Sequence, residues 1–143
     1  MIDFEAHELV CPHIYRRDGE GAMKYIDPRL KTWLAWFRKH IGRPVYANNY
    51  QWGGDKSQRG YRCNLCSLVA EKTEKNILYL SAHTRFQAID FNVKDAAADD
   101  VRQWIDRHQD EMPVNIRIER NTNGWVHVDV ANDTPYKIIY FNP

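Results

Sequence analysis

The chain has almost no excess charge of either sign. Its 143 residues carry 20 lysines and arginines against 19 aspartates and glutamates, which gives a formal net charge of +1. A protein that binds the phosphate backbone of nucleic acid by counterion release needs a strongly positive surface. The charge balance therefore indicates that nucleic acid is not the partner.

Long hydrophobic runs are also missing. No stretch approaches the ~20 consecutive apolar residues that span a bilayer. The N-terminal sequence MIDFEAHELV carries acidic residues where a signal peptide has positive charge followed by a continuous apolar run. We therefore expect no membrane partner, and we expect the protein to be cytoplasmic on synthesis.

Cysteine is scarce, and its count of three is odd. Without an export signal, this count favours reduced thiols or metal ligands over a disulfide framework. Cys11 and His13 in CPH, together with Cys63 and Cys66 in CNLC, offer four soft ligands that are able to close a structural zinc site. A single C-x-x-C is a weak signal, however, and the sequence favours reduced, partly buried thiols and a surface histidine.

Apolar and aromatic residues, by contrast, are sufficient for one core. Hydrophobic residues make up 43% of the chain and aromatic residues 13%, and a chain of this length is about one domain long. No internal repeat or linker divides it. Residues 1–143 are therefore predicted to form a single domain.

Two helices follow from apolar spacing. Asp27 and Pro28 suit an N-cap and a first helical position, and apolar residues then recur at helical intervals until Gly42. This pattern predicts a helix over 28–41. A second helix is expected from about Ala96 to Gln109, before Pro113.

Strict alternation near the C-terminus predicts a β-hairpin with one apolar face. In VNIRIERNTNGWVHVDV, isoleucines and valines fill one face, and Glu119, His127 and Asp129 lie on the other. Every register that buries both apolar rows keeps Glu119 on the face of His127. If Glu119 lies across from Trp125, it is diagonal to His127, at roughly 7–8 Å between backbones.

The same alternation in AIDFNV presents Asp90 from a strand, and YKIIYF is expected to add a final strand to the sheet. The segment 44–49 is a further strand candidate, and a long loop is expected after it. The predicted fold class is α+β: a single domain in which an antiparallel sheet carries the site and helices pack on the opposite face.

One histidine and one aspartate lie seven residues apart in SAHTRFQAIDFNV, and another histidine follows in GWVHVDV. His83 in a loop, with Asp90 and His127 on strands, leaves the fourth position of a tetrahedral zinc open, as in catalytic sites. The spacing alone is weak evidence, because His13 and Glu20 have the same separation.

The whole pattern is more specific: Ser81-x-His83, then Ala88-x-Asp90-Phe91, then Trp125-x-His127-x-Asp129. It resembles the zinc peptidases that include D-Ala-D-Ala carboxypeptidases, D-Ala-D-Ala dipeptidases and phage L-alanyl-D-glutamate endopeptidases, whose fold is shared by the hedgehog signalling domain. The resemblance covers roughly residues 40–130.

This resemblance implies that His83, Asp90 and His127 bind Zn²⁺. It also implies that Arg62, in the segment GYR, steadies a carbonyl or carboxylate of the substrate, for which a guanidinium suits because it donates two parallel hydrogen bonds. Arg59, three residues earlier, is the second candidate for this role.

Two positions depart from the family pattern. Phe86 stands where the family usually has glycine, and Gly124 stands three residues before the last histidine, where the family often has its catalytic carboxylate. The hairpin alternation offers Glu119 as the general base instead. Asp129 is second, because its position suits a hydrogen-bond partner of a metal-bound histidine.

The function implied by the resemblance is that of a zinc metallopeptidase, a carboxypeptidase or endopeptidase. Its substrate is the peptidoglycan stem peptide, cleaved at a D-Ala-D-Ala or L-Ala-D-Glu bond. Such an enzyme fits an endolysin-like role in cell-wall degradation, in a phage or prophage, with release to the wall by another protein. Two alternatives stay open: a non-catalytic, metal-containing module that binds peptides or cell wall on the same fold, and a metal-free interaction domain.

Overall fold

Five strands form one sheet in the computed structural model, which describes residues 4–142. Their spatial order is β1-β2-β4-β3-β5. The strands are β1 (Val45–Tyr46), β2 (Ala88–Val93), β3 (Ile116–Glu119), β4 (Val126–Asp129) and β5 (Ile138–Phe141). The predicted α+β class is confirmed, as is the hairpin of β3 and β4.

The sheet is mixed, so the prediction of an antiparallel sheet is wrong at one edge. Pairing is antiparallel between β1 and β2, β2 and β4, and β4 and β3. The predicted last strand joins the sheet as β5, but it runs parallel to β3. Strands β3 and β5 both run opposite to β4. Because β5 pairs with β3 and not with β4, its pairing is parallel.

Both predicted helices are present. Helix α3 (Pro28–Ile41) has the expected limits: the side chain of Asp27 accepts a hydrogen bond from the backbone N–H of Arg29, at 2.9 Å, and Gly42 ends the helix in the left-handed conformation. Helix α5 (Ala98–Arg107) lies inside the range predicted for it.

Helices α3 and α5 pack against one face of the sheet through aromatic residues. The ring of Phe91 in β2 lies 5.2 Å from that of Phe37 and 6.3 Å from that of Trp33, between ring centroids. Trp104 of α5 contacts Phe37 edge-on at 5.6 Å. The inward-facing side chains of the hairpin, such as Val128, are fully buried in the same core, and the alternate side chains of the strands point to the opposite face of the sheet.

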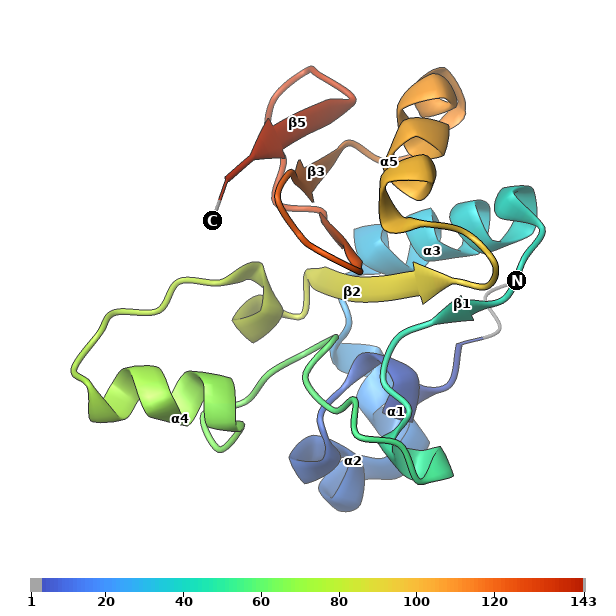
Figure 1. The fold of residues 1–143 in the computed structure, drawn as a ribbon. Helices are drawn as coiled ribbons and strands as arrows, with labels where there is room; N and C mark the ends of the chain where they lie inside the picture. Colours follow the sequence, from blue (N-terminus) through green and yellow to red (C-terminus); the bar gives the residue numbers. More distant parts are fainter. Residues whose placement is uncertain (1–3, 143) are drawn as a thin grey trace.

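The other helices are short and were not predicted. They are α1 (Ala6–Leu9), α2 (Pro12–Asp18) and α4 (Ser67–Glu74), with 3₁₀ turns η1 (Gly19–Tyr25), η2 (Tyr50–Trp52), η3 (Ala82–Arg85) and η4 (Gln109–Glu111). Figure 1 shows α1 and α2 together below β2, whereas α4 lies at the periphery of the domain. None of the helices in residues 4–142 is long and apolar enough to cross a membrane.

The cap of α3 makes a measurable contribution to stability. Hydrogen bonds from the Arg29 guanidinium lower the pKa of Asp27 to about 2. We expect Asp27→Ala to reduce the free energy of unfolding by about 1 kcal/mol at neutral pH. Because the pKa of Asp27 is lower in the folded than in the unfolded protein, its ionised carboxylate stabilises the fold above the unfolded pKa of ~3.9. This stabilisation is lost as the pH falls towards 2. Denaturant titrations at pH 7 and pH 2.5 measure both effects.

The matched control is Asp55→Ala, whose side chain is 88% exposed and makes only a 3.9 Å ion pair with Lys56. It should leave stability within about 0.5 kcal/mol of wild type. The assigned cap is contradicted if Asp27→Ala and Asp55→Ala lose the same free energy of unfolding. It is also contradicted if the difference between Asp27→Ala and wild type does not become smaller at pH 2.5.

Candidate metal centre

The pairing of β2 with β4 places Asp90 directly opposite His127. Both strands turn their apolar residues, such as Ile89 and Val128, into the core. Because successive side chains on a strand point to opposite faces, Asp90 and His127 then share the other face. The Nδ1 atom of His127 lies 2.8 Å from Oδ1 of Asp90.

His83 reaches the same point from η3, the 3₁₀ turn that precedes β2. Its backbone N–H donates to the hydroxyl of Ser81, which caps the turn at 3.1 Å. Its ring Nδ1 donates to the backbone carbonyl of Gly60 at 2.8 Å. This bond orients the ring so that Nε2 lies 3.3 Å from Oδ1 of Asp90.

Asp129 orients the ring of His127 from the other side. Its Oδ2 lies 2.8 Å from Nε2 of His127, and the guanidinium of Arg117 holds both carboxylate oxygens, at 2.8 and 2.9 Å. Asp129 is fully buried. A carboxylate that binds the outer nitrogen of a histidine is the usual support of a metal-binding imidazole.

His83, Asp90 and His127 form a ligand set of the kind that binds a divalent cation. One ligand atom each from His83, Asp90 and His127 lies within 4.8 Å of the others, and the residues are only 3%, 7% and 5% exposed. In both histidines the second ring nitrogen is already bonded, to Gly60 and to Asp129. Two imidazoles and one carboxylate therefore fit zinc with an open fourth position.

The electrostatics match this arrangement. Burial raises the pKa of Asp90, but hydrogen bonds from His127 and His83 outweigh it and hold that pKa well below its ordinary value. Burial lowers the pKa of His127, but its bonds to Asp129 and Asp90 outweigh this effect and raise it to about 9. The ligand carboxylate is thus ionised, and a cation that binds His127 replaces a proton.

A cavity of about 570 Å³ opens beside these three residues. Glu119 lines it, with its Oε2 3.9 Å from Nδ1 of His127. The register of the hairpin pairs Arg117 with Asp129, so that Glu119 continues opposite His127. Glu119 therefore lies on the face of His127, as the alternation predicted; the register with Glu119 across from Trp125, which the sequence left open, is not the one adopted.

Of the two candidate arginines, Arg62 faces the cavity. Its Nη2 lies 3.2 Å from Oδ2 of Asp90, and its Nη1 donates to the hydroxyl of Tyr79 at 2.8 Å. Arg59 lines a smaller neighbouring hollow. Its contribution to the site comes from its backbone carbonyl, which accepts a hydrogen bond from the N–H of Asp90 at 2.6 Å.

The two departures from the family pattern have local explanations. Phe86 has φ of 60°, the left-handed conformation that glycine adopts most readily. Its ring stacks on that of Tyr61 with centroids 3.6 Å apart. Gly124 has φ of 95° in the turn before β4, which explains a glycine at this position instead of a carboxylate.

Three contributors to the site were not predicted: the carbonyl of Gly60, the guanidinium of Arg117 and the hydroxyl of Tyr79. Arg117 shares the polar face of β3 with Glu119, so the alternation pattern contained a signal for it. The other two come from loops, for which residue spacing carries no such signal.

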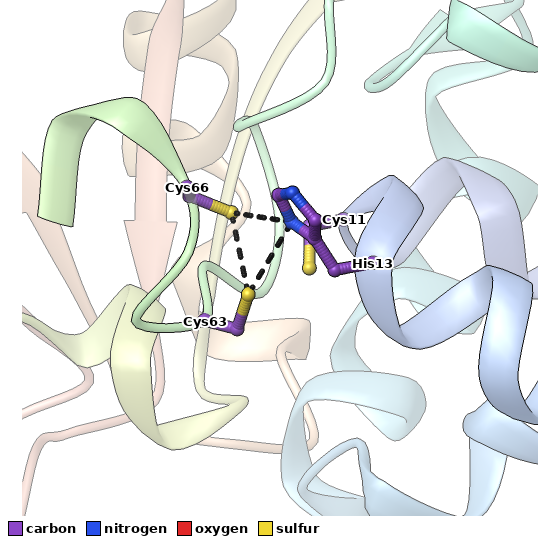
Figure 2. Close-up of side chains that lie close together, drawn as sticks. All are labelled: Cys11, His13, Cys63 and Cys66. Atoms are coloured by element: carbon purple, nitrogen blue, oxygen red, sulfur yellow. Dashed lines mark hydrogen bonds between the residues drawn. The ribbon is translucent and has the colours of Figure 1, made fainter. Parts of the chain in front are cut away.

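The four soft ligands noted in the sequence also come together. The sequence favoured reduced, partly buried thiols and a surface histidine over a zinc site; the structure places Cys11, His13, Cys63 and Cys66 around one point (Figure 2), which makes a metal site possible. All three cysteines are free thiols. This cluster is separate from the group of His83 and its partners.

Comparisons of the chain with models of protein families, with curated proteins and with solved structures gave no match.

The geometry predicts that His127 is required for cation binding at this centre. We expect His127→Ala to bind one Zn²⁺ fewer per chain than wild type, because the site loses one of its three ligands. Elemental analysis after dialysis against a weak chelator measures the difference. His40→Ala, which changes an exposed histidine outside both ligand groups, is the control and should keep the wild-type content. Equal zinc in all three proteins rules out this centre.

Proposed function

We propose that this chain is a zinc-dependent peptidase that hydrolyses peptide bonds in bacterial peptidoglycan stem peptides, of the D-Ala-D-Ala or L-Ala-D-Glu type. The observation that carries the proposal is the buried set of His83, Asp90 and His127 beside a cavity lined by Arg62 and Glu119. An incomplete ligand set next to a substrate-sized cavity is typical of a catalytic site.

A zinc ion held by His83, Asp90 and His127 would supply the Lewis acidity that makes water nucleophilic near neutral pH and polarises a carbonyl. The transfer of protons is assigned to a residue of the chain. Glu119 takes the proton of the attacking water and returns it to the leaving amine. Its side chain is only 18% exposed and lies at the wall of the cavity, close to His127.

Asp129 is better suited to a positioning role than to proton transfer. Both of its oxygens are bound to Arg117, and it also accepts from His127 and from the backbone N–H of Ala131. Hydrogen bonds of this kind outweigh burial and lower the pKa of Asp129. A carboxylate with no free lone pair facing the cavity is a poor proton acceptor, which supports Glu119 as the general base.

Arg62 is proposed to bind the substrate carbonyl or carboxylate. Its guanidinium is 12% exposed and borders the cavity next to Asp90. The bond to the Tyr79 hydroxyl and a second one to the carbonyl of Gln58, at 2.7 Å, restrict its orientation. A charged donor that is already oriented binds a carboxylate with little further loss of side-chain entropy.

The choice of peptidoglycan rests on the resemblance of the SAHTRFQAID and GWVHVDV segments to zinc peptidases of the cell wall. The non-catalytic, metal-containing binding module remains the alternative. It is favoured by the glycine at position 124, where the family often has its catalytic carboxylate.

Substitution of the general base separates these two functions. We expect Glu119→Gln to lower kcat by about 10²–10⁴-fold, the usual contribution of general acid–base catalysis, with unchanged zinc content. Mass spectrometry of purified muropeptides after incubation, with quantification of new termini over time, measures the rate. Glu74→Gln, an exposed change on α4, is the matched control.

If neither wild type nor Glu119→Gln produces new termini, but both bind the muropeptides, the binding module is supported instead of the enzyme. If wild type and His127→Ala produce the same termini, the proposed centre is not the site of cleavage.

The two arginines give a second test. We expect Arg62→Gln to raise KM or lower kcat/KM by about 10–100-fold, which corresponds to the loss of about 1.5–3 kcal/mol from a charge-assisted hydrogen bond. Arg59→Gln should have a smaller effect, because only its backbone carbonyl contacts Asp90. Steady-state kinetics on one muropeptide measures both. A larger loss in Arg59→Gln reverses the assignment.

A further inference from the structure

Four side chains with soft ligand atoms surround one point at the junction of the N-terminal helices and the loop that precedes α4 (Figure 2). The ring Nδ1 of His13 lies 3.4 Å from the sulfur of Cys63 and 3.7 Å from that of Cys66, and the two sulfurs are 3.9 Å apart. With Cys11, all four ligand atoms lie within 4.8 Å of one another.

The three distances among His13, Cys63 and Cys66 are close to those of the edges of a zinc tetrahedron. Zn–S bonds of about 2.3 Å and Zn–N bonds of about 2.0 Å, at tetrahedral angles, separate two sulfurs by about 3.8 Å and a sulfur from a nitrogen by about 3.5 Å. Ordinary packing of buried thiols does not require that three of them share a centre with an imidazole nitrogen. The ligands come from two pairs, Cys11 with His13 and Cys63 with Cys66, that lie at least 50 residues apart along the chain.

We propose that Cys11, His13, Cys63 and Cys66 bind a structural Zn²⁺ ion. Three thiolates and one imidazole are soft ligands that select zinc over magnesium or calcium. Four protein ligands leave no open position, so this site differs in kind from the one at His127. The proposal goes beyond the proposed function and does not depend on it.

The turn that carries Cys63 and Cys66 has the local geometry of a metal-binding C-x-x-C. The backbone N–H of Leu65 points at the sulfur of Cys63, at 3.4 Å, and the N–H of Cys66 donates to the carbonyl of Cys63 at 3.1 Å. Backbone donors to a ligand sulfur are the outer contacts that orient and stabilise a bound thiolate. Cys11 and Cys66 are buried, whereas His13 and Cys63 are partly exposed.

The ion joins two segments that already touch. The N–H of Tyr61 donates to the carbonyl of Leu9 at 2.8 Å, and Val10 pairs with Tyr61 in a parallel bridge. A Cβ atom on Gly60 would lie 2.1 Å from the carbonyl oxygen of Leu9, so only glycine permits this approach. The ligands Cys11 and Cys63 follow closely after the paired residues Val10 and Tyr61.

This arrangement links the four-ligand site to the candidate centre. Gly60 supplies the carbonyl that orients the ring of His83, and the N–H of Arg62 donates to the carbonyl of His83 at 3.0 Å. Cys63 follows Arg62 directly. A zinc ion held by Cys63 therefore clamps the loop that contains Arg59, Gly60 and Arg62.

Cobalt substitution of the full chain, purified under reducing conditions, tests the proposal. Thiolate ligands give Co²⁺ intense charge-transfer absorption in the near ultraviolet, whereas the ligands at His127 do not. We expect wild type and His127→Ala to show these bands, and Cys63→Ala to lose them along with one metal ion per chain.

A second variant keeps the test valid if Cys63→Ala does not fold. His13→Cys replaces an imidazole ligand by a thiolate ligand, so it should retain the ion and show stronger near-ultraviolet absorption. The control is His40→Cys, on an exposed part of α3, which should match wild type. The proposed site is ruled out if cobalt-loaded wild type lacks the near-ultraviolet charge-transfer bands, or if cobalt-loaded Cys63→Ala retains them. Loss of peptidase activity alone bears on the centre at His127, not on this site.

Limited proteolysis tests the clamp. If the ion holds the loop, Cys63→Ala is cleaved by trypsin after Lys56, Arg59 or Arg62 faster than wild type, and a chelator makes wild type equally sensitive. Equal cleavage rates in all these conditions overturn the clamping role.

Discussion

The buried carboxylate of Asp90 is the interaction on which the candidate centre depends. It contacts His127, His83 and Arg62, and its backbone N–H is bonded to the carbonyl of Arg59. A carboxylate this deeply buried is costly unless charged or hydrogen-bonding partners surround it. The partners of Asp90 come from a 3₁₀ turn, a strand and a loop, so this one group requires three separate parts of the chain to meet.

The loop from Arg59 to Cys63 gives the domain a continuous path between its two ligand clusters. On one side, Gly60 and Arg62 contact His83. On the other, Tyr61 pairs with the N-terminal segment, and Cys63 joins the four-ligand cluster. Under the two proposals, one zinc ion performs chemistry and the other holds in place the loop that carries the substrate-binding arginine. The two roles follow from the ligands, because three leave an open position and four do not.

Phe86 and Glu119 lie close to the candidate centre, and each has a local structural explanation. Phe86 adopts the left-handed backbone that glycine favours, and its ring stacks on that of Tyr61. Glu119 lies beside His127 from the neighbouring strand β3. Position 124, three residues before His127, is a glycine, so this carboxylate comes from the paired strand.

The sequence by itself determined helix α3 with its Asp27 cap, the hairpin, and the face of the sheet that carries Asp90, Glu119 and His127, because periodicities of 3.6 and 2 are local properties of the chain. Only the tertiary structure decided the parallel pairing of β5, the choice of Arg62 over Arg59 as the residue facing the cavity, and the convergence of the three cysteines with His13. These features depend on loop paths and on contacts between residues distant in sequence, for which local patterns contain no information.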